Sequence, residues 1–399
     1  MTTIINLARP ADRLSEVRPS AIREIFDRAV QIEKAGHAVI HFEIGRPDFD
    51  TPEVIKDATA KALADGLVHY GPNAGLPVLR AAISEYLQRS QGLEYSAEDE
   101  VLVTIGANEA VLLSILAFCG PGDEVVIPVP AWPAYEACAR LAGAAPVLLP
   151  LTLDTEYKVD PAALRGAITE RTRMVVLCTP HNPTGAVLDQ ALLEEIADIV
   201  RGTNAIILSD EIYGELVYGG TRHLSPAAVA DLKERTLIIG GFAKSWAMDG
   251  WRLGWLGGPR DLVRPALRVR QFTTTCPPTF PQIGGAAALN SADGEREEMR
   301  QEFERRRAAA LEILSQQNVF SYAAPNGAFY LYLSFPEALG TAHELALKIL
   351  EEKHVAVVPG TAFDIDGGSQ SLRISYACGI DDLKEGLRRI MAAVSSQER

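Results

Sequence analysis

Lys244 is the side chain in this sequence whose surroundings most favour chemistry. It follows an apolar run and two glycines, and Arg252 comes eight residues later in a loop rich in glycine and tryptophan. A lysine amine is strongly hydrated, so placing it beside Phe242 and Trp246 costs free energy unless the amine has a chemical task. Desolvation lowers the pKa of a lysine and makes its amine nucleophilic toward a carbonyl, as a Schiff base requires. The alternative is a surface lysine in an exposed loop, and this segment alone does not separate the two.

Other polar and aromatic residues also follow the carboxyl ends of segments that we predict to be strands. Each has an ordinary explanation, because Asn182 suits a turn, Trp132 suits a core and Asp210 suits a helix cap. In open α/β sheets, however, ligands bind at the carboxyl edge, and chance does not readily bring so many such residues to one edge. We therefore expect one ligand site there, formed by Gly106, Ala107, Asn108, Trp132, Asn182, Asp210, Tyr213 and Lys244.

The strands that would carry these residues alternate with helices along the chain. Short, continuous apolar runs predict strands at residues 101–105, 124–128, 146–150, 174–178, 205–209, 237–240 and 254–257. Segments with helical spacing separate most of them, one beginning near Glu109. This alternation is typical of an α/β fold in which a mostly parallel sheet has helices on both faces.

A smaller α+β domain is expected beside the large one. Its predicted strands lie at residues 39–44, 329–333, 355–358 and 371–376. A long charged helix near residues 295–307 would lead out of the large domain. The expected organisation is an N-terminal arm at 1–14, a large domain with the ligand site at 45–285, and a small domain made of 15–44 and 286–399.

Composition limits the classes of function. The chain has 399 residues, of which 47% are hydrophobic and 23% charged, as in an ordinary soluble globular protein. Its net charge of −14 argues against non-specific binding to nucleic acid or to an anionic membrane, and no apolar run is long enough to span a bilayer. The N-terminal residues show no signal peptide, and the five scattered cysteines show no metal-ligand spacing. We therefore expect a cytoplasmic protein with reduced thiols and no metal.

Several motifs, in order, resemble those of a known family. They are Asn182-Pro-Thr-Gly185, Ser209-Asp-Glu-Ile-Tyr213 and the tract from Lys244 through Gly250-Trp-Arg-Leu-Gly254, flanked by residues 42–52 and 373–376. The chain resembles, over nearly its whole length, the pyridoxal-phosphate-dependent aminotransferases of the aspartate aminotransferase family (fold type I, class I/II). The resemblance implies the cofactor pyridoxal 5'-phosphate. It also implies that an amino group moves between an amino acid and a 2-oxo acid by a ping-pong mechanism.

The resemblance further implies a role for each residue around the cofactor ring. Lys244 would form the Schiff base with the cofactor and then move a proton between the substrate Cα and the cofactor C4′. Asp210 would pair with the pyridinium nitrogen and keep the ring protonated, so that the ring can accept electrons. Tyr213 and Asn182 would hydrogen-bond to the ring oxygen O3′, and Trp132 would stack on the ring face.

By the same resemblance, the cofactor phosphate would bind where a helix begins, at the Gly106-Ala-Asn108 tract. Arg252 and the backbone N–H groups of Ala107 and Asn108 would hold it. Tyr70 of the neighbouring subunit would also reach this phosphate. The expected assembly is therefore a homodimer with shared active sites.

At the substrate end, Arg373 would clamp the α-carboxylate bidentately beside Asn182, and Gly45 would let the backbone approach the substrate. Some aspartate-specific members of the family carry a lysine where Asn108 stands. Others carry an arginine in the tract that matches residues 272–281, and this tract contains none here. Both absences argue against an enzyme specific for dicarboxylates.

The chain departs from the family pattern beside the lysine. Serines often serve there as extra phosphate ligands, and their places are taken by Gly241 and Ala243. The phosphate is therefore expected to depend more on Arg252 and on backbone amides. Asp249 replaces a commoner threonine, and nothing in the sequence explains it.

Two other functions remain open at this stage. A lyase or synthase that eliminates, replaces or cyclises part of an amino acid would use the same cofactor and fold, and no motif separates it from an aminotransferase. An amine-sensing regulator that reuses the fold would need a DNA-binding domain, and only about forty-four residues precede the expected large domain.

Overall fold

The computed structural model describes residues 10–19, 21–229, 231–364 and 370–395. Its largest sheet has seven strands. In spatial order they are β2 (Val101–Thr104), β8 (Gly254–Gly257), β7 (Thr236–Gly241), β6 (Ile206–Asp210), β5 (Thr172–Cys178), β3 (Glu124–Val129) and β4 (Ala145–Pro150). All neighbours pair in parallel except β8, which is antiparallel to both β2 and β7. The predicted mostly parallel sheet is confirmed.

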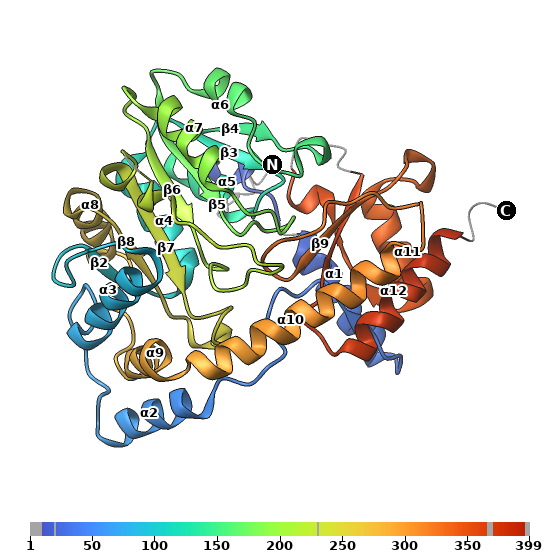
Figure 1. The fold of residues 1–399 in the computed structure, drawn as a ribbon, viewed down its shortest axis with the longest axis horizontal. Helices are drawn as coiled ribbons and strands as arrows, with labels where there is room; N and C mark the ends of the chain where they lie inside the picture. Colours follow the sequence, from blue (N-terminus) through green and yellow to red (C-terminus); the bar gives the residue numbers. More distant parts are fainter. Residues whose placement is uncertain (1–9, 20, 230, 365–369, 396–399) are drawn as a thin grey trace, which may run out of the picture.

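Helices cover both faces of this sheet (Figure 1). One face packs against α4 (Gly106–Phe118), α5 (Ala134–Ala142) and α8 (Arg260–Gln271). The other packs against α6 (Pro161–Ala167), α7 (Gln190–Val200), α3 (Pro77–Gln91) and α9 (Phe280–Ser291), with α2 (Glu53–Ala64) lying against α9. In β7, Leu237 and Ile239 join the first core while Ile238 joins the second. Because both faces are buried, the strand reads as a continuous apolar run.

A smaller body contains the remaining strands and four helices (Figure 1). In one small sheet β1 (Ile40–His41) pairs in parallel with β10 (Val355–Ala356). In the other, β12 (Ser371–Ser375) lies between β11 (Val358–Pro359) and β9 (Tyr330–Ser334), antiparallel to both. The helices are α1 (Ala21–Lys34), α10 (Asp293–Leu314), α11 (Ala342–Lys353) and α12 (Ile380–Ser395).

The structure corrects three of the predicted elements. The strand expected at 39–44 is limited to Ile40–His41, because residues 43–45 leave the sheet to line a cavity. The strand expected at 355–358 is two short strands in different sheets, separated at Val357. The helix expected to begin near Glu109 begins at Gly106, one turn earlier.

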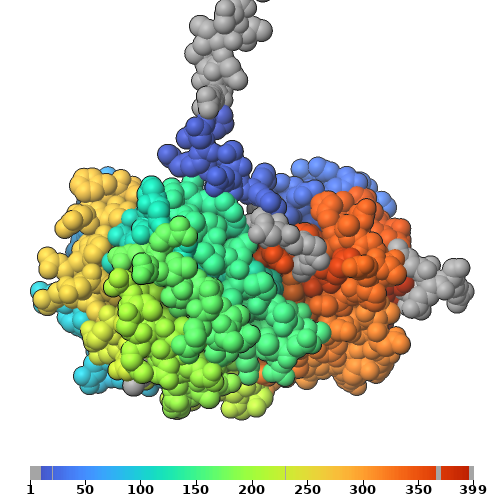
Figure 2. Space-filling view, turned by 90° about the horizontal axis from the view of Figure 1, so that it is seen from above, coloured from blue at the N-terminus to red at the C-terminus, as the bar shows by residue number. Residues whose placement is uncertain are grey.

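The predicted arm, 1–14, is only partly described, since residues 1–9 lie outside the described residues. The part that follows forms a short 3-10 helix, η1 (Asp12–Glu16), and Glu16 pairs with Arg140 of α5 at 3.0 Å. This segment lies on the surface of the molecule (Figure 2). The other 3-10 helices are η2 (Leu153–Thr155), η3 (Pro226–Ala228), η4 (Lys233–Arg235), η5 (Asp249–Trp251), η6 (Glu337–Leu339) and η7 (Gly360–Ala362). Among the described helices, none combines the length and apolar character that crossing a membrane requires.

Candidate active site

A cavity of about 560 Å³ lies at the carboxyl edge of the large sheet. Every site residue expected from the sequence lines it except Tyr70. These residues are Gly45, Gly106, Ala107, Asn108, Trp132, Asn182, Asp210, Tyr213, Lys244, Arg252 and Arg373. Residues from α1, Ile22, Arg23 and Phe26, line it as well. Residues of both bodies of the molecule therefore line the cavity.

Lys244 follows the end of β7 and extends into this cavity. Its Nζ donates a hydrogen bond to the backbone oxygen of Gly45 at 2.5 Å and lies 5.9 Å from the ring centroids of Tyr213 and Phe329. Burial lowers the pKa of Lys244 to about 8, although the Asp249 carboxylate opposes this by raising it. A substantial fraction of this amine is thus neutral, and nucleophilic, near pH 8.

Asp210 is the last residue of β6, and its carboxylate is almost fully buried. Its Oδ2 accepts a hydrogen bond from Tyr135 Oη at 2.7 Å, and its Oδ1 accepts one from the N–H of Ile212 at 3.2 Å. Burial raises the pKa of Asp210 to about 6, whereas the hydrogen bond from Tyr135 lowers it. A cationic ring nitrogen beside this carboxylate would stabilise its charged form, which burial disfavours.

Tyr213 and Tyr330 face each other across the cavity floor. Their hydroxyl oxygens are 2.7 Å apart, and burial holds the pKa of both phenols above the ordinary value. A Cβ built on Gly45 would come within 2.2 Å of Tyr330 Oη. Gly45 is therefore required by the packing of Tyr330 against the backbone, in addition to the expected approach of a substrate.

Arg373 presents a buried guanidinium to the cavity. Its Nη1 donates to Oδ1 of Asn182 at 3.2 Å, and its Nη2 donates to the backbone oxygen of Glu43 at 2.7 Å. The group lies between the rings of Tyr330 and Phe363, 4.5 and 4.8 Å from their centroids. Its Nε forms no hydrogen bond within the described part of the chain. The guanidinium packs against the two aromatic rings and has further N–H groups that can donate to a carboxylate.

The opposite end of the cavity has the chemistry of an anion site. Helix α4 begins at Gly106, so the N–H groups of its first turn lack partners within the helix. A Cβ on Gly106 would lie 2.9 Å from Arg252 Nη2, and a Cβ on Gly254 would lie 2.9 Å from the N of Ala107. Gly106 thus leaves room for the Arg252 guanidinium, and Gly254 lets β8 pack closely against the start of α4. A guanidinium and a helix N-terminus line the cavity here. A buried carboxylate, a lysine amine and this anion cradle fit the nitrogen, carbonyl and phosphate of pyridoxal phosphate.

The structure shows what surrounds two of the departures from the family pattern. A Cβ at Gly241 would lie 2.8 Å from Cδ1 of Ile212, so a serine at this buried end of β7 would require the end of that side chain to shift. Asp249 has a carboxylate that raises the pKa of Lys244. Ala243 lines the cavity, and nothing in the structure explains why it is not a serine.

Tyr70 does not take part in the cavity of its own chain. Its side chain is 93% exposed, in the loop between α2 and α3. The prediction that it serves a neighbouring subunit requires such exposure, but a single chain does not test it.

Sequence reasoning missed Tyr135, Tyr330 and Glu43 as residues of the site. Tyr135 comes three residues after Trp132, and its ring meets Trp132 edge-on with centroids 5.5 Å apart. Because Trp132 was expected to stack on a ring, a tyrosine three residues later could have been recognised as a neighbour of the site. Tyr330 lies in an apolar strand, where a tyrosine is ordinarily part of the core, so the sequence carried no comparable signal.

Comparisons with known proteins agree with this geometry. Residues 37–390 match the family described as aminotransferase class I and II. The chain is 39% identical over 382 residues to an aspartate aminotransferase of Pyrococcus abyssi, an alignment that covers 95% of this chain and 97% of that protein. It is 38% identical over 382 residues to aromatic-amino-acid aminotransferase 2 of Thermococcus litoralis, with the same coverage of 95% and 97%. The structure of aspartate aminotransferase from Thermus thermophilus with maleate superposes with a TM-score of 0.91 at 34% identity, covering 97% of this chain and all of that one.

Proposed function

The chain belongs to the class I and II aminotransferases, which use pyridoxal phosphate, and we propose a role for each residue of its cavity in amino-group transfer. The observation that carries the proposal is the position of Lys244. Its amine lies in one cavity with a buried carboxylate, a buried guanidinium and a helix N-terminus. Bound pyridoxal phosphate supplies a carbonyl for the amine and a ring that accepts electrons from the substrate.

Lys244 acts first as a nucleophile and then as the group that carries a proton. Its pKa of about 8 leaves the amine able to bond a carbonyl and, once released, able to take a proton from the substrate Cα. The Gly45 oxygen receives the amine hydrogen bond and orients it. Asp210 holds the proton on the ring nitrogen, and Tyr135 fixes the orientation of that carboxylate. Tyr213 and Asn182, which line the cavity, would donate to the ring oxygen, and Trp132 would stack on the ring face.

Arg373 binds the α-carboxylate common to the amino acid and the 2-oxo acid. It has N–H groups beyond the two that bond Asn182 and Glu43, and these can donate to a carboxylate. Arg252 and the first turn of α4 would hold the cofactor phosphate, so the cavity would bind one anion there and another at Arg373. Because both substrates of the ping-pong cycle carry the same carboxylate, one clamp serves both half-reactions.

The lining of the cavity includes the apolar side chains of Ile22, Phe26 and Ile44, and Asn108 supplies no cation. Arg23 and Arg46 also line the cavity, so the lining is not wholly apolar. The relatives include both aspartate and aromatic-amino-acid aminotransferases. We propose that this enzyme accepts apolar or aromatic amino acids and is not specific for dicarboxylates.

The proposed working form is a cytoplasmic homodimer with shared active sites. Tyr70 is exposed and does not line the cavity of its own chain, and it would reach the phosphate of the partner's site. The proposed division is a large domain at 45–285 and a small domain at 15–44 with 286–399. The pairing of β1 with β10 supports the joining of the two separate parts of the small domain.

The lyase or synthase alternative is not favoured, because the relatives named above are aminotransferases. A single half-reaction shows whether the enzyme is an aminotransferase or a lyase or synthase. Adding amino acid alone to the loaded enzyme should convert the cofactor to stable pyridoxamine phosphate, seen by absorbance, with one 2-oxo acid released per site. Release of ammonia in repeated turnovers, with no conversion of the cofactor, would indicate elimination instead.

A further inference from the structure

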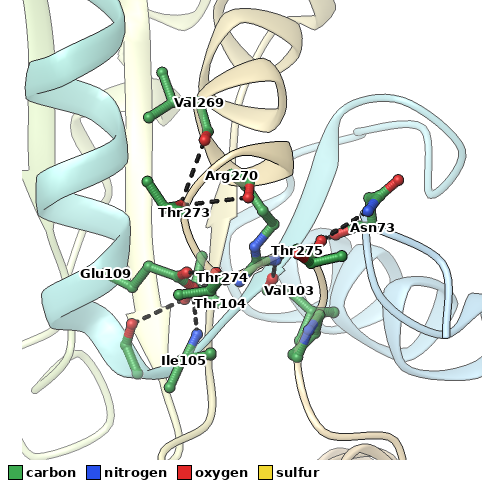
Figure 3. A network of polar contacts seen from close by, with 12 residues as sticks. Asn73, Val103, Thr104, Ile105, Glu109, Val269, Arg270, Thr273, Thr274 and Thr275 are labelled. Atoms are coloured by element: carbon green, nitrogen blue, oxygen red, sulfur yellow. Dashed lines mark hydrogen bonds and ion pairs between the residues drawn. The ribbon is translucent and has the colours of Figure 1, made fainter. Parts of the chain in front are cut away.

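A buried ion pair lies at the first turn of α4 (Figure 3), and neither of its residues lines the cavity. Glu109, on α4, accepts a hydrogen bond at Oε2 from Arg270 Nη2 of α8, and the arginine side chain is 0% exposed. The same Oε2 accepts the backbone N–H of Ile105 at 2.6 Å. Ile105 is the residue that precedes the helix, and its own side chain makes no capping bond. The carboxylate therefore fixes the turn that ends β2 and begins α4.

The pair also connects this turn to two loops of the same subunit. Thr274, in the loop 272–279 between α8 and α9, donates its hydroxyl to Glu109 Oε1. Arg270 donates from Nη1 to the backbone oxygens of Val103 and of Asn73, the latter at 3.3 Å. Asn73 belongs to the loop 65–76 between α2 and α3, and its Nδ2 donates to the oxygen of Thr275 at 2.7 Å. One buried pair thus joins both loops to the start of α4.

These two loops carry the most exposed large apolar side chains among the described residues. Tyr70 is 93% exposed in the first loop, and Phe272 is 87% exposed in the second. The network therefore lies between the phosphate end of one cavity and the surface that a partner subunit would cover.

The charges of the pair explain why both members are present. A carboxylate in the first turn of a helix suits the helix dipole, but it stands close to the place proposed for an anionic phosphate. Arg270 neutralises this carboxylate and contributes donors that hold the backbone around it. Removing one partner of a buried pair leaves an uncompensated charge, so the two residues act as a unit.

We propose that Glu109 and Arg270 are positioning residues for the cofactor phosphate. They hold the N–H groups of Gly106, Ala107 and Asn108 in the shape that the phosphate requires and tie this shape to loops 65–76 and 272–279. This inference rests on the proposed function of the α4 N-terminus. Neither residue lines the cavity, so each acts only through the backbone that it holds.

Binding of inorganic phosphate and of pyridoxal phosphate to the cofactor-free protein tests the inference, with calorimetry as the readout. Glu109→Ala should weaken both affinities by about tenfold, as expected for loss of hydrogen bonds to a charged group. Glu109→Gln keeps an oxygen for Ile105 and Arg270 and an amide for Thr274, so it should recover most of the affinity. Thr274→Val removes one hydrogen bond to Glu109 and leaves the charges of the ion pair unchanged. It should weaken the binding of both ligands by about threefold. It serves as the main variant if Glu109→Ala does not fold.

Glu124→Ala is the matched control. Glu124 is also buried and accepts hydrogen bonds from Arg171 and Thr169. It is the first residue of β3, so it lies at the amino ends of the parallel strands and not at the carboxyl ends, where the cavity lies. This variant should lose thermal stability and keep both affinities. Wild-type affinities in Glu109→Ala or in a folded Thr274→Val, or an equal loss in Glu124→Ala, would overturn the positioning role alone. Failure of the wild-type protein to bind either ligand would overturn the proposed phosphate site, and the inference with it.

Discussion

Tyr135 Oη donates a hydrogen bond to Asp210 Oδ2 across 2.7 Å, and both side chains are buried. The tyrosine thereby stabilises the ionised carboxylate against burial, which raises the pKa of Asp210 to about 6. Asp210 can hold a proton on the cofactor ring only while it is itself ionised. The strength of the electron sink therefore depends on Tyr135 of α5, through its hydrogen bond to the carboxylate.

Tyr135→Phe should raise the pKa of Asp210, because it removes an interaction that favours the charged form. A hydrogen bond to a charged group contributes about 1.5–3 kcal/mol, which corresponds to about one to two pKa units. The acidic limb of the pH–rate profile should move to higher pH by about that amount, and turnover at neutral pH should fall. An acidic limb that keeps its position would remove Tyr135 from this role.

Lys244 should destabilise the cofactor-free protein at neutral pH. Its pKa falls from 10.5 in the unfolded chain to about 8 in the folded one, so the folded state binds this proton more weakly. The cost is fully present below pH 8 and disappears as the pH rises through 10.5, where the amine is neutral in both states.

Lys244→Met removes this charge at similar volume. The stability advantage of the variant over the wild type should be about 3 kcal/mol at pH 7 and narrow by about 2 kcal/mol at pH 9.5. Urea unfolding of both cofactor-free proteins at the two pH values measures the change. A difference that stays constant with pH would show that the amine is not desolvated in the folded state.

Arg373→Lys should lower kcat/KM for every amino-acid substrate. Lysine keeps the charge but not the planar fork, and it cannot be held between Tyr330 and Phe363 as a guanidinium is. We expect kcat/KM to fall at least tenfold, which corresponds to the free energy of one hydrogen bond to a charged group. Steady-state kinetics on a panel of amino acids gives the values, and a simple amine without a carboxylate is the control. The assignment fails if kcat/KM for amino acids is unchanged.

Tyr70→Phe should weaken cofactor binding by about 1.5–3 kcal/mol if its hydroxyl bonds the phosphate of the partner's site. Mixing two kinds of mutant subunit shows whether Tyr70 serves the partner's site or the site of its own chain. A mixed dimer of Lys244→Ala and Tyr70→Phe subunits has one intact site if Tyr70 acts across the interface, so wild-type affinity should reappear in part of the sites. If exchange is demonstrated and no such sites appear, Tyr70 acts within its own chain or not at all.

The site was largely predictable from sequence because it follows a topological rule. Parallel strands end at one edge, so Asp210 and Lys244 had to lie near each other once their strands were recognised. Tyr330 was not predictable in this way, since a tyrosine in an apolar strand is usually core. The pair of Glu109 and Arg270 was hidden for another reason, as 161 residues separate its members and both lie in ordinary helical segments.

Strand boundaries in the small body were less predictable for a related reason. The apolar run at 355–358 indicates burial, but it does not say which neighbour each residue will pair with. The structure pairs its first half with β1 and its end with β12, and the chain changes sheet at Val357. Pairing partners depend on tertiary contacts that one strand's composition does not contain.

Lys244 is proposed to carry the cofactor, and a chemical experiment tests this most directly. The loaded enzyme is treated with borohydride, which makes the link between amine and cofactor permanent, then digested and mapped by mass spectrometry. Lys244→Arg, treated in the same way, is the control and should give no labelled peptide. We expect the pyridoxyl group on Lys244 alone, and its recovery on any other lysine of the wild-type protein would show that Lys244 is not the residue that carries the cofactor.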